Sequence, residues 1–175
     1  MITGLLLSLW MRSYRFDQIE LGLQKVGLWS ALATGLLGGI FLVIGRIGFQ
    51  MIFTRVRSGL LKHPLYRGPV GTWALTFLVG GIVEEVWRAL SLIAMQDAGF
   101  STIFAIAATS VSFVFANLSG IPSRIPGTPI EGLWEFMLGT VLAGLFLESK
   151  TVVVPYLAGL LFNTANLYLV RHVAR

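Results

Sequence analysis

The sequence predicts an all-α, polytopic integral membrane protein, a bundle of roughly five or six transmembrane helices. Of its 175 residues, 55% are hydrophobic and only 12% are charged, and the mean hydropathy is +0.80. The apolar residues gather in runs of about 20, the length that spans a bilayer. Most Lys and Arg residues lie between those runs, as the positive-inside rule expects.

The composition also excludes several classes of function. The chain has no cysteine, which removes disulfides, thiolate catalysis and Cys-ligated zinc. No spacing of His and carboxylate residues is typical of a metal site. The net charge of +5 could indicate a nucleic-acid partner, but the basic residues occupy the loops of a membrane protein. We therefore expect no metal, no cofactor and no nucleic acid, while a lipid or another apolar ligand could fill a cavity.

Residues 1–25 form an N-terminal segment whose first part is too short to span. Met1 to Met11 is apolar, but it lacks the basic start and the cleavage site of a signal peptide. With Trp10 and the arginines that follow it, this segment is typical of an interfacial helix or a partial span. The first full span is expected at about Val26 to Gly45, where glycines allow close helix packing.

The stretch from Arg46 to Arg67 is basic and contains no acidic residue. We expect it to continue the preceding helix into the cytoplasmic interface before His63 and Pro64 break it. Placing this stretch inside the cell puts Arg124 and the C-terminal arginines on the same side. The charge rule thus favours the cytoplasmic membrane with a cytoplasmic C-terminus.

Residues typical of helix ends bound the next two spans. The span from Pro69 to Met95 leads to Gly99, a C-cap residue. Ser101 can N-cap the following span, Thr102 to Leu118. Residues 119–129 are rich in Pro and Gly and are expected to form a loop, because prolines there prevent a helix.

The last two spans are separated by a tight turn. Thr128, Pro129 and Glu131 form a capping-box pattern that starts a span reaching about Leu147. After a turn over residues 148–150, Thr151 to Val170 is the last span. All spans are expected to pack as one membrane domain over residues 1–175.

The run from Pro69 to Met95 carries Glu84, Glu85 and Arg88 in its middle. An ionisable group at bilayer depth costs roughly 2.5 to 3.5 kcal/mol, so these groups must pair or face a polar cavity. Glu84 and Arg88 share a helix face, and Glu85 lies three residues before Arg88. The cluster is either a structural ion pair, or a pair plus a second carboxylate that polarises a water as general base.

Side-chain amides on the later spans are the candidate partners of this cluster. Asn117, Asn163 and Asn166 lie within apolar runs. A single intramembrane Asn usually bonds a neighbouring helix, but amides on two spans together with the charged cluster predict one polar centre.

The remaining titratable residues are expected outside that centre. Glu131 is explained as a helix-capping residue, and Glu135 is expected near the headgroups beside Trp134. His63 and His172 fall outside the spans and are expected to be solvated.

These residues, in this order, resemble the motifs of the CPBP family of intramembrane proteases, which includes CAAX prenyl endopeptidases and ABI-like bacteriocin-processing proteins. That family carries Glu-Glu-x-x-x-Arg, Phe-x-x-x-His and His-x-x-x-Asn on separate helices. Here the run from Glu84 to Arg88 is one residue shorter, Phe113 to Asn117 ends in Asn, and Gly159 to Asn163 begins with Gly. The resemblance covers residues 69–170, the expected protease-like core, and implies the CPBP fold.

The resemblance implies that Glu84, beside Glu85 and Arg88, activates water, that Asn117 positions it and that Asn163 donates to the oxyanion. An Asn amide does not exchange a proton near neutral pH. Loss of one preorganised donor costs roughly 100- to 1,000-fold in rate, and both motif histidines are replaced.

We therefore expect a catalytically degenerate pseudo-enzyme, acting as a structural or binding subunit of a membrane assembly with lipid and other membrane proteins as partners. One alternative is an active glutamate-dependent intramembrane endopeptidase that hydrolyses CAAX-type peptides. The other is a small transporter with Glu84 or Glu85 as a proton-relay residue.

Overall fold

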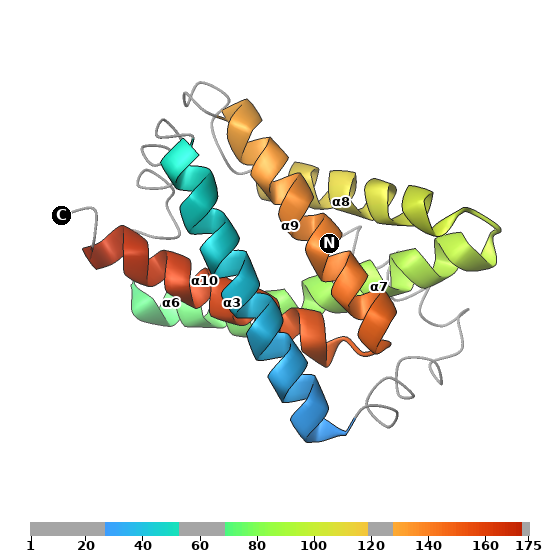
Figure 1. Ribbon diagram of the computed structural model, residues 1–175, viewed down its shortest axis with the longest axis horizontal. Helices are drawn as coiled ribbons and strands as arrows, with labels where there is room; N and C mark the ends of the chain where they lie inside the picture. The colour runs from blue at the N-terminus through green and yellow to red at the C-terminus, as the bar shows by residue number, and fades with distance from the viewer. Residues whose placement is uncertain (1–26, 53–68, 119–127, 173–175) are drawn as a thin grey trace.

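The structure is a computed structural model that describes residues 27–52, 69–118 and 128–172. Within those ranges every regular element is a helix, which confirms the all-α prediction (Figure 1). The expectations for Met1 to Met11, for the basic residues 53–67, and for the loop residues 119–127 lie outside the described residues.

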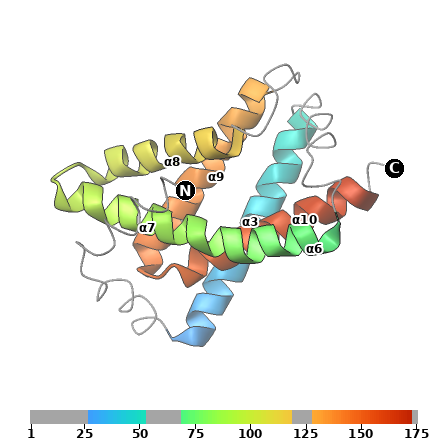
Figure 2. The ribbon, with the colours of Figure 1, turned by 180° about the vertical axis from the view of Figure 1, so that it is seen from behind.

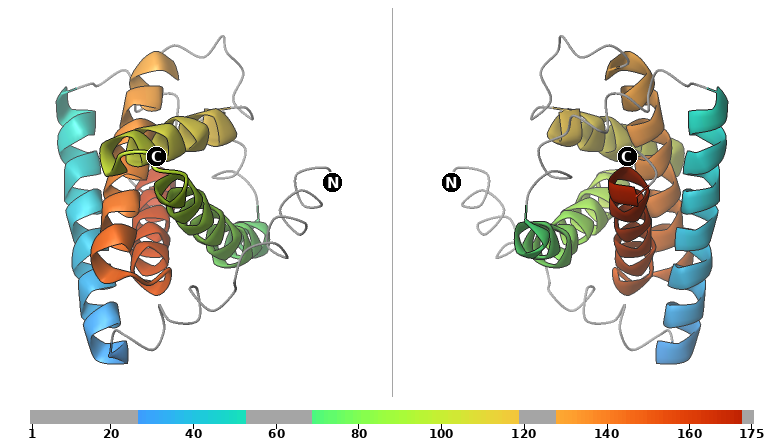
Figure 3. Two further views of the ribbon diagram at one scale, coloured as in Figure 1. Left: turned by 90° about the vertical axis from the view of Figure 1, so that its right-hand side faces the viewer. Right: turned by 90° about the vertical axis from the view of Figure 1, so that its left-hand side faces the viewer.

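The glycine-rich face of the first helix packs closely against the last. Helix α3 spans Leu28–Ile52 and α10 spans Val153–His172, and the side views show them next to each other (Figure 3). A Cβ added at Gly35 would lie 2.8 Å from the Leu157 Cβ, and one at Gly39 would lie 2.9 Å from the Leu161 Cβ. The predicted use of these glycines is confirmed, because only a residue without a side chain permits this approach.

The second expected span is a continuous helical run with a π-helical segment inside it. Helix α6 (Val70–Leu75), the π-helix η1 (Thr76–Gly80) and α7 (Gly81–Asp97) follow one another without a loop, and in the view of Figure 2 the run crosses in front of α10. A π-helical turn shifts the backbone hydrogen bonds by one residue. The Tyr156 hydroxyl of α10 donates to the Leu78 carbonyl over 3.2 Å, which ties this turn to the bundle directly before the acidic pair.

The caps around residue 100 agree with the sequence. Gly99 has a φ of 86°, its N–H donates to the Gln96 carbonyl, and the Phe100 N–H donates to the Met95 carbonyl. These are the bonds of a Schellman C-cap. Helix α8 spans Thr102–Leu118, and the Phe104 N–H donates to Ser101 Oγ over 3.3 Å. Both predicted caps are confirmed.

The turn between the last two helices also forms where expected. Helix α9 spans Thr128–Ser149, and Lys150 follows with a φ of 55° and an N–H that donates to the Phe146 carbonyl. The Val153 N–H then donates to Thr151 Oγ1 over 3.3 Å. Thr151 therefore caps α10 from outside the helix, two residues before it begins.

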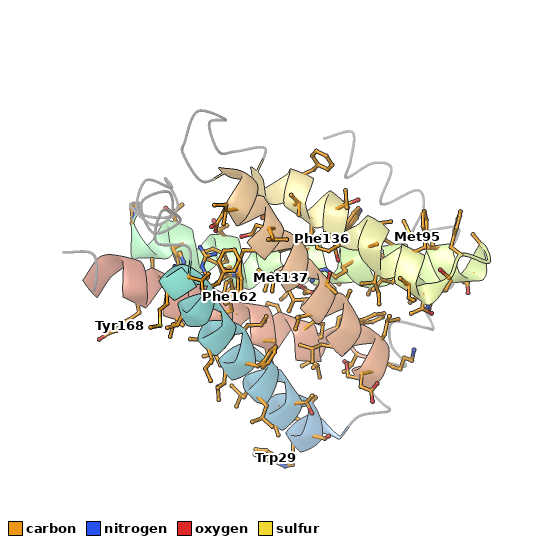
Figure 4. The ribbon with its side chains drawn as sticks, turned by 45° about the horizontal axis from the view of Figure 1, so that its top comes forward. Trp29, Met95, Phe136, Met137, Phe162 and Tyr168 are labelled. Atoms are coloured by element: carbon orange, nitrogen blue, oxygen red, sulfur yellow. The ribbon has the colours of Figure 1, made fainter. Side chains whose placement is uncertain are left out.

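The main core is aromatic and lies between α3, α9 and α10. The Trp134 ring centroid is 5.2 Å from that of Phe49 and 5.9 Å from that of Phe162. In Figure 4, Phe162 lies within the bundle, whereas Trp29 and Tyr168 point away from it. A second, smaller cluster of buried residues joins α7, α8 and α9.

The outer surface is apolar, as a bilayer requires. In the described part of the chain, the helices Leu28–Ile52 and Ile130–Ser149 are long and apolar enough to cross a membrane. Large apolar side chains such as Phe41, Ile103 and Phe115 are exposed on the outside of the bundle. The described fold is a helical membrane bundle.

Candidate functional site: a polar network from α7 to α3

Glu85 and Arg88 form a buried ion pair within α7. Glu85 is 5% exposed and Arg88 is 1% exposed, and Arg88 Nη1 donates to Glu85 Oε1. The i,i+3 spacing on one helix face produces this contact. The guanidinium carbon also lies 4.6 Å from the centroid of the Phe113 ring, so a cation–π contact joins α7 to α8.

Glu84 lies beside this pair without belonging to it. Its side chain is half-buried, and it forms no ion pair with another described residue. The charges that act on it come from Arg88 and Glu85 on its own helix, and it lies within electrostatic range of Glu135 on α9. Glu84 is thus the carboxylate of α7 that remains without a basic partner of its own.

Asn117 bonds to α9 and not to the acidic pair of α7. Its Nδ2 donates to Glu135 Oε2 over 3.0 Å, and both side chains are half-buried. Glu135 thus faces α8 and is bonded to Asn117, a contact that the sequence did not predict. Helix α9 returns alongside α8, and this packing turns Glu135 toward the neighbouring helix.

A second ion pair, which the sequence did not predict, joins α3 to α9. Arg46 is 1% exposed, and its Nη2 donates to Glu131 Oε1 over 2.7 Å. The Arg46 guanidinium carbon lies 5.3 Å from the Trp134 ring centroid. Arg46 is therefore buried, and is not one of the interfacial cations that the sequence suggested. Glu131, which was expected to cap its own helix, pairs with Arg46.

Three separate contacts, Glu85–Arg88, Asn117–Glu135 and Arg46–Glu131, together with the neighbouring Glu84, make up what we call the polar network. Glu135 lies within electrostatic range of Glu84 on one side and of Glu131 and Arg46 on the other. Each arginine forms an ion pair with one glutamate, which leaves Glu84 and Glu135 without a basic partner among the described residues. Helix α9 takes part in two of these contacts, because Glu135 bonds to Asn117 of α8 and Glu131 pairs with Arg46 of α3.

Several buried atoms of the network have no hydrogen-bond partner among the described residues: Arg46 Nε and Nη1, Glu85 Oε2, Arg88 Nη2 and Glu131 Oε2. Buried polar atoms of this kind usually bond to ordered water or to a polar ligand. The network is therefore able to hold polar groups inside an otherwise apolar bundle.

The spacing of two acids on α9 could have revealed its part in the network. Glu131 and Glu135 are four residues apart and so share a helix face with each other. Such a pair at membrane depth suggests a polar centre as strongly as Glu84 and Glu85 do. The capping-box pattern at the helix start offered a simpler local explanation and hid this signal.

Helix α10 contributes less than the sequence predicted. Asn163 is half-buried, and no hydrogen bond joins it to a carboxylate of the described residues; Asn166 is 4% exposed. One turn before Asn163, a Cβ added at Gly159 would meet no atom within 4 Å. The structure thus joins Glu85 to Arg88 and Asn117 to Glu135, and leaves open space at Gly159.

Within the described ranges, no group of three or more His, Cys, Asp or Glu residues is arranged to hold a metal ion. The groups of the polar network are carboxylates, guanidinium groups and one amide.

A comparison with protein families gives a match for residues 66–165, more than half of the chain. The matching family model is described as type II CAAX prenyl endopeptidase Rce1-like. The matched range contains the predicted site residues of α7, α8 and α10 as well as Glu131 and Glu135 of α9, whereas α3 with Arg46 lies before it. No curated protein and no solved structure matches the chain.

Proposed function

Because the chain belongs to the type II CAAX prenyl endopeptidase Rce1-like family, a branch of CPBP-protease-like membrane proteins, we propose that it retains the fold as a non-catalytic subunit. It binds a membrane segment of a partner protein, or a lipid, where a catalytic relative would hold its substrate. The polar network then stabilises the bundle and contacts the bound molecule, and no bond is cleaved.

The observation that carries this proposal is that the polar residues bond to one another. Arg88 forms an ion pair with Glu85, and the Asn117 amide donates a hydrogen bond to Glu135. In a hydrolase, such groups instead hold a water and stabilise the oxyanion. Asn117 and Gly159 also supply no imidazole, so no group at either position can carry a proton in the required step.

A second candidate function is favoured by the half-buried state of Glu84. Glu84 has no basic partner among the described residues, and the hydrogen bond from Asn117 to Glu135 fixes one amide within the same network. Glu84 could then take a proton from water while the water oxygen attacks a peptide carbonyl, and return that proton to the amide nitrogen as the C–N bond breaks, so that a carboxylic acid and an amine are released. This is the slow, glutamate-dependent endopeptidase that the sequence analysis kept as an alternative.

The two functions are separated by a cleavage assay in liposomes. The protein and its Glu84→Gln variant are reconstituted with a fluorescent, prenylated CAAX-type peptide, and the product is measured over time. The matched control is Asp97→Asn, the same change at an exposed acid at the end of α7. We expect no product above the protein-free background from any of the three proteins.

Cleavage that disappears in Glu84→Gln and persists in Asp97→Asn would overturn the proposal and establish the endopeptidase. The same liposomes test binding, because a photo-crosslinkable form of the peptide reports occupancy. We expect saturable crosslinking that weakens in Glu84→Gln and in Glu135→Gln, since each change removes a carboxylate that has no basic partner.

A further inference from the structure

An apolar groove lies between α3 and α9, toward the opposite ends of these helices from Arg46 and Glu131. It has a volume of about 540 Å³ and is lined by one face of α3 between Thr34 and Phe41 and by one face of α9 between Val141 and Glu148. Leu37 and Phe41 form its α3 side and are 67% and 65% exposed. The groove belongs to the outer surface of the bundle and is separate from the polar network.

Gly144 lines the groove and, having no side chain, leaves space at its bottom. A Cβ added at Gly144 would meet no atom within 4 Å, so the space above it is free in the single chain. Gly38 lies opposite, where an added Cβ would be 2.9 Å from Leu145 Cδ1. Small residues at such a position let another membrane helix approach closely.

The groove has a charged end. Glu148 lines it, and Lys150 lies two residues further along, just after α9 ends; both are exposed. Neither side chain forms an ion pair with a residue in the described part of the chain. An acidic and a basic residue are therefore exposed two positions apart in the sequence, at the end of α9 that borders the groove.

We propose that this groove is the contact surface for a second copy of the chain. Two copies inserted in the same direction are related by a two-fold axis along the membrane normal, so equivalent residues lie at equal depth. Glu148 of each copy can then pair with Lys150 of the other, while the exposed Leu37 and Phe41 of each copy cover the other's groove. A lipid chain could fill the groove, but it would leave this charge complementarity unused.

The proposal does not depend on whether the polar network is catalytic. Its test is the oligomeric state of the full chain in phosphatidylcholine liposomes, measured by single-molecule photobleaching at increasing lipid dilution. The chain has no cysteine, so one cysteine added after Arg175 carries the fluorophore specifically. We expect two-step bleaching at dilutions where randomly co-reconstituted monomers would bleach in one step.

Two sets of variants locate the contact. Gly144→Leu fills the open floor and should weaken dimerisation by about tenfold or more, a loss of the size of a few apolar contacts. Gly48→Leu is the matched control, because Gly48 is also a helical glycine with no atom within 4 Å of an added Cβ, but lies outside the groove. The control variant should dimerise like the unchanged protein.

Charge reversal keeps the test valid even where Gly144→Leu disturbs folding. Glu148→Lys and Lys150→Glu should each weaken the dimer, and the double variant should restore it, because each pair again joins opposite charges. A monomer at every dilution overturns the proposal in favour of lipid in the groove. Equal effects of Gly144→Leu and Gly48→Leu, or double reversal without restoration, overturn it as well.

Discussion

Arg46 is 1% exposed and lies in an apolar helix, so its charge must be balanced inside the protein. Glu131 provides the balancing charge from a position 85 residues away in the sequence. Burying two charges is costly, and their attraction offsets that cost only while both are present. Removing one partner should therefore be much more damaging than removing both.

We predict that Arg46→Met lowers the free energy of unfolding by about 3 kcal/mol or more, because Glu131 is left buried without its partner. The double variant Arg46→Met/Glu131→Leu should recover most of that loss. Chemical unfolding in detergent micelles measures both quantities. A double variant at least as unstable as the sum of the single variants would show that the pair is not coupled in this way.

Residues of the network differ in how far the sequence could predict them. The Glu85–Arg88 pair is local, so helical spacing was sufficient to predict it. The Asn117–Glu135 bond joins two helices across a loop, and Arg46–Glu131 joins helices from distant parts of the chain. Such contacts depend on which helices pack together, and no periodicity in one segment contains that information.

The helices were predicted from their apolar runs, and the bounds of some of them from residues typical of helix ends. Ser101 and Gly99 act through hydrogen bonds to backbone atoms within a few residues, so a short stretch of sequence determines them. The π-helical turn at Thr76–Gly80 was not predicted, because its residues are ordinary apolar helix formers. Its stabilising contact from Tyr156 comes from another helix.

The contact between α3 and α10 gives a prediction at the scale of elements. In Gly35→Ala, the new Cβ would lie 2.8 Å from the Leu157 Cβ and 3.1 Å from the Val154 carbonyl oxygen, so the helices must move apart. We expect a loss of about 1 to 3 kcal/mol in the free energy of unfolding, as for overpacked cores.

The control for this prediction is Gly48→Ala on the same helix, where an added Cβ meets no atom within 4 Å. There the change should be neutral, or stabilising by up to about 1 kcal/mol, because alanine favours a helix more than glycine does. Thermal unfolding of both variants in the same detergent gives the comparison. Equal stability of Gly35→Ala and Gly48→Ala would contradict the close packing of α3 on α10.

At the scale of the whole molecule, one network connects helices inside and outside the family match. Glu84, Asn117 and Glu135 lie within residues 66–165, whereas Arg46 on α3 lies before them. Arg46 pairs with Glu131 of α9, so α3 contributes to the network as well as to the fold. The resemblance to the CPBP family correctly implied the family and the fold. The pairing of Arg46 on α3 with Glu131 depends on how the helices pack and could not be predicted from the motifs.

We attribute the proposed lack of catalysis to the two missing imidazoles. The most direct test is to restore them in Asn117→His/Gly159→His and to measure cleavage of a prenylated peptide in liposomes. The open space at Gly159 admits a larger side chain, and an imidazole N–H at residue 117 can donate to Glu135 as the amide does. We predict that the unchanged protein is inactive and that the double variant gains Glu84-dependent cleavage of about 100-fold or more above background. An unchanged protein that already cleaves as fast as the double variant, with the activity lost in Glu84→Gln, would contradict the claim.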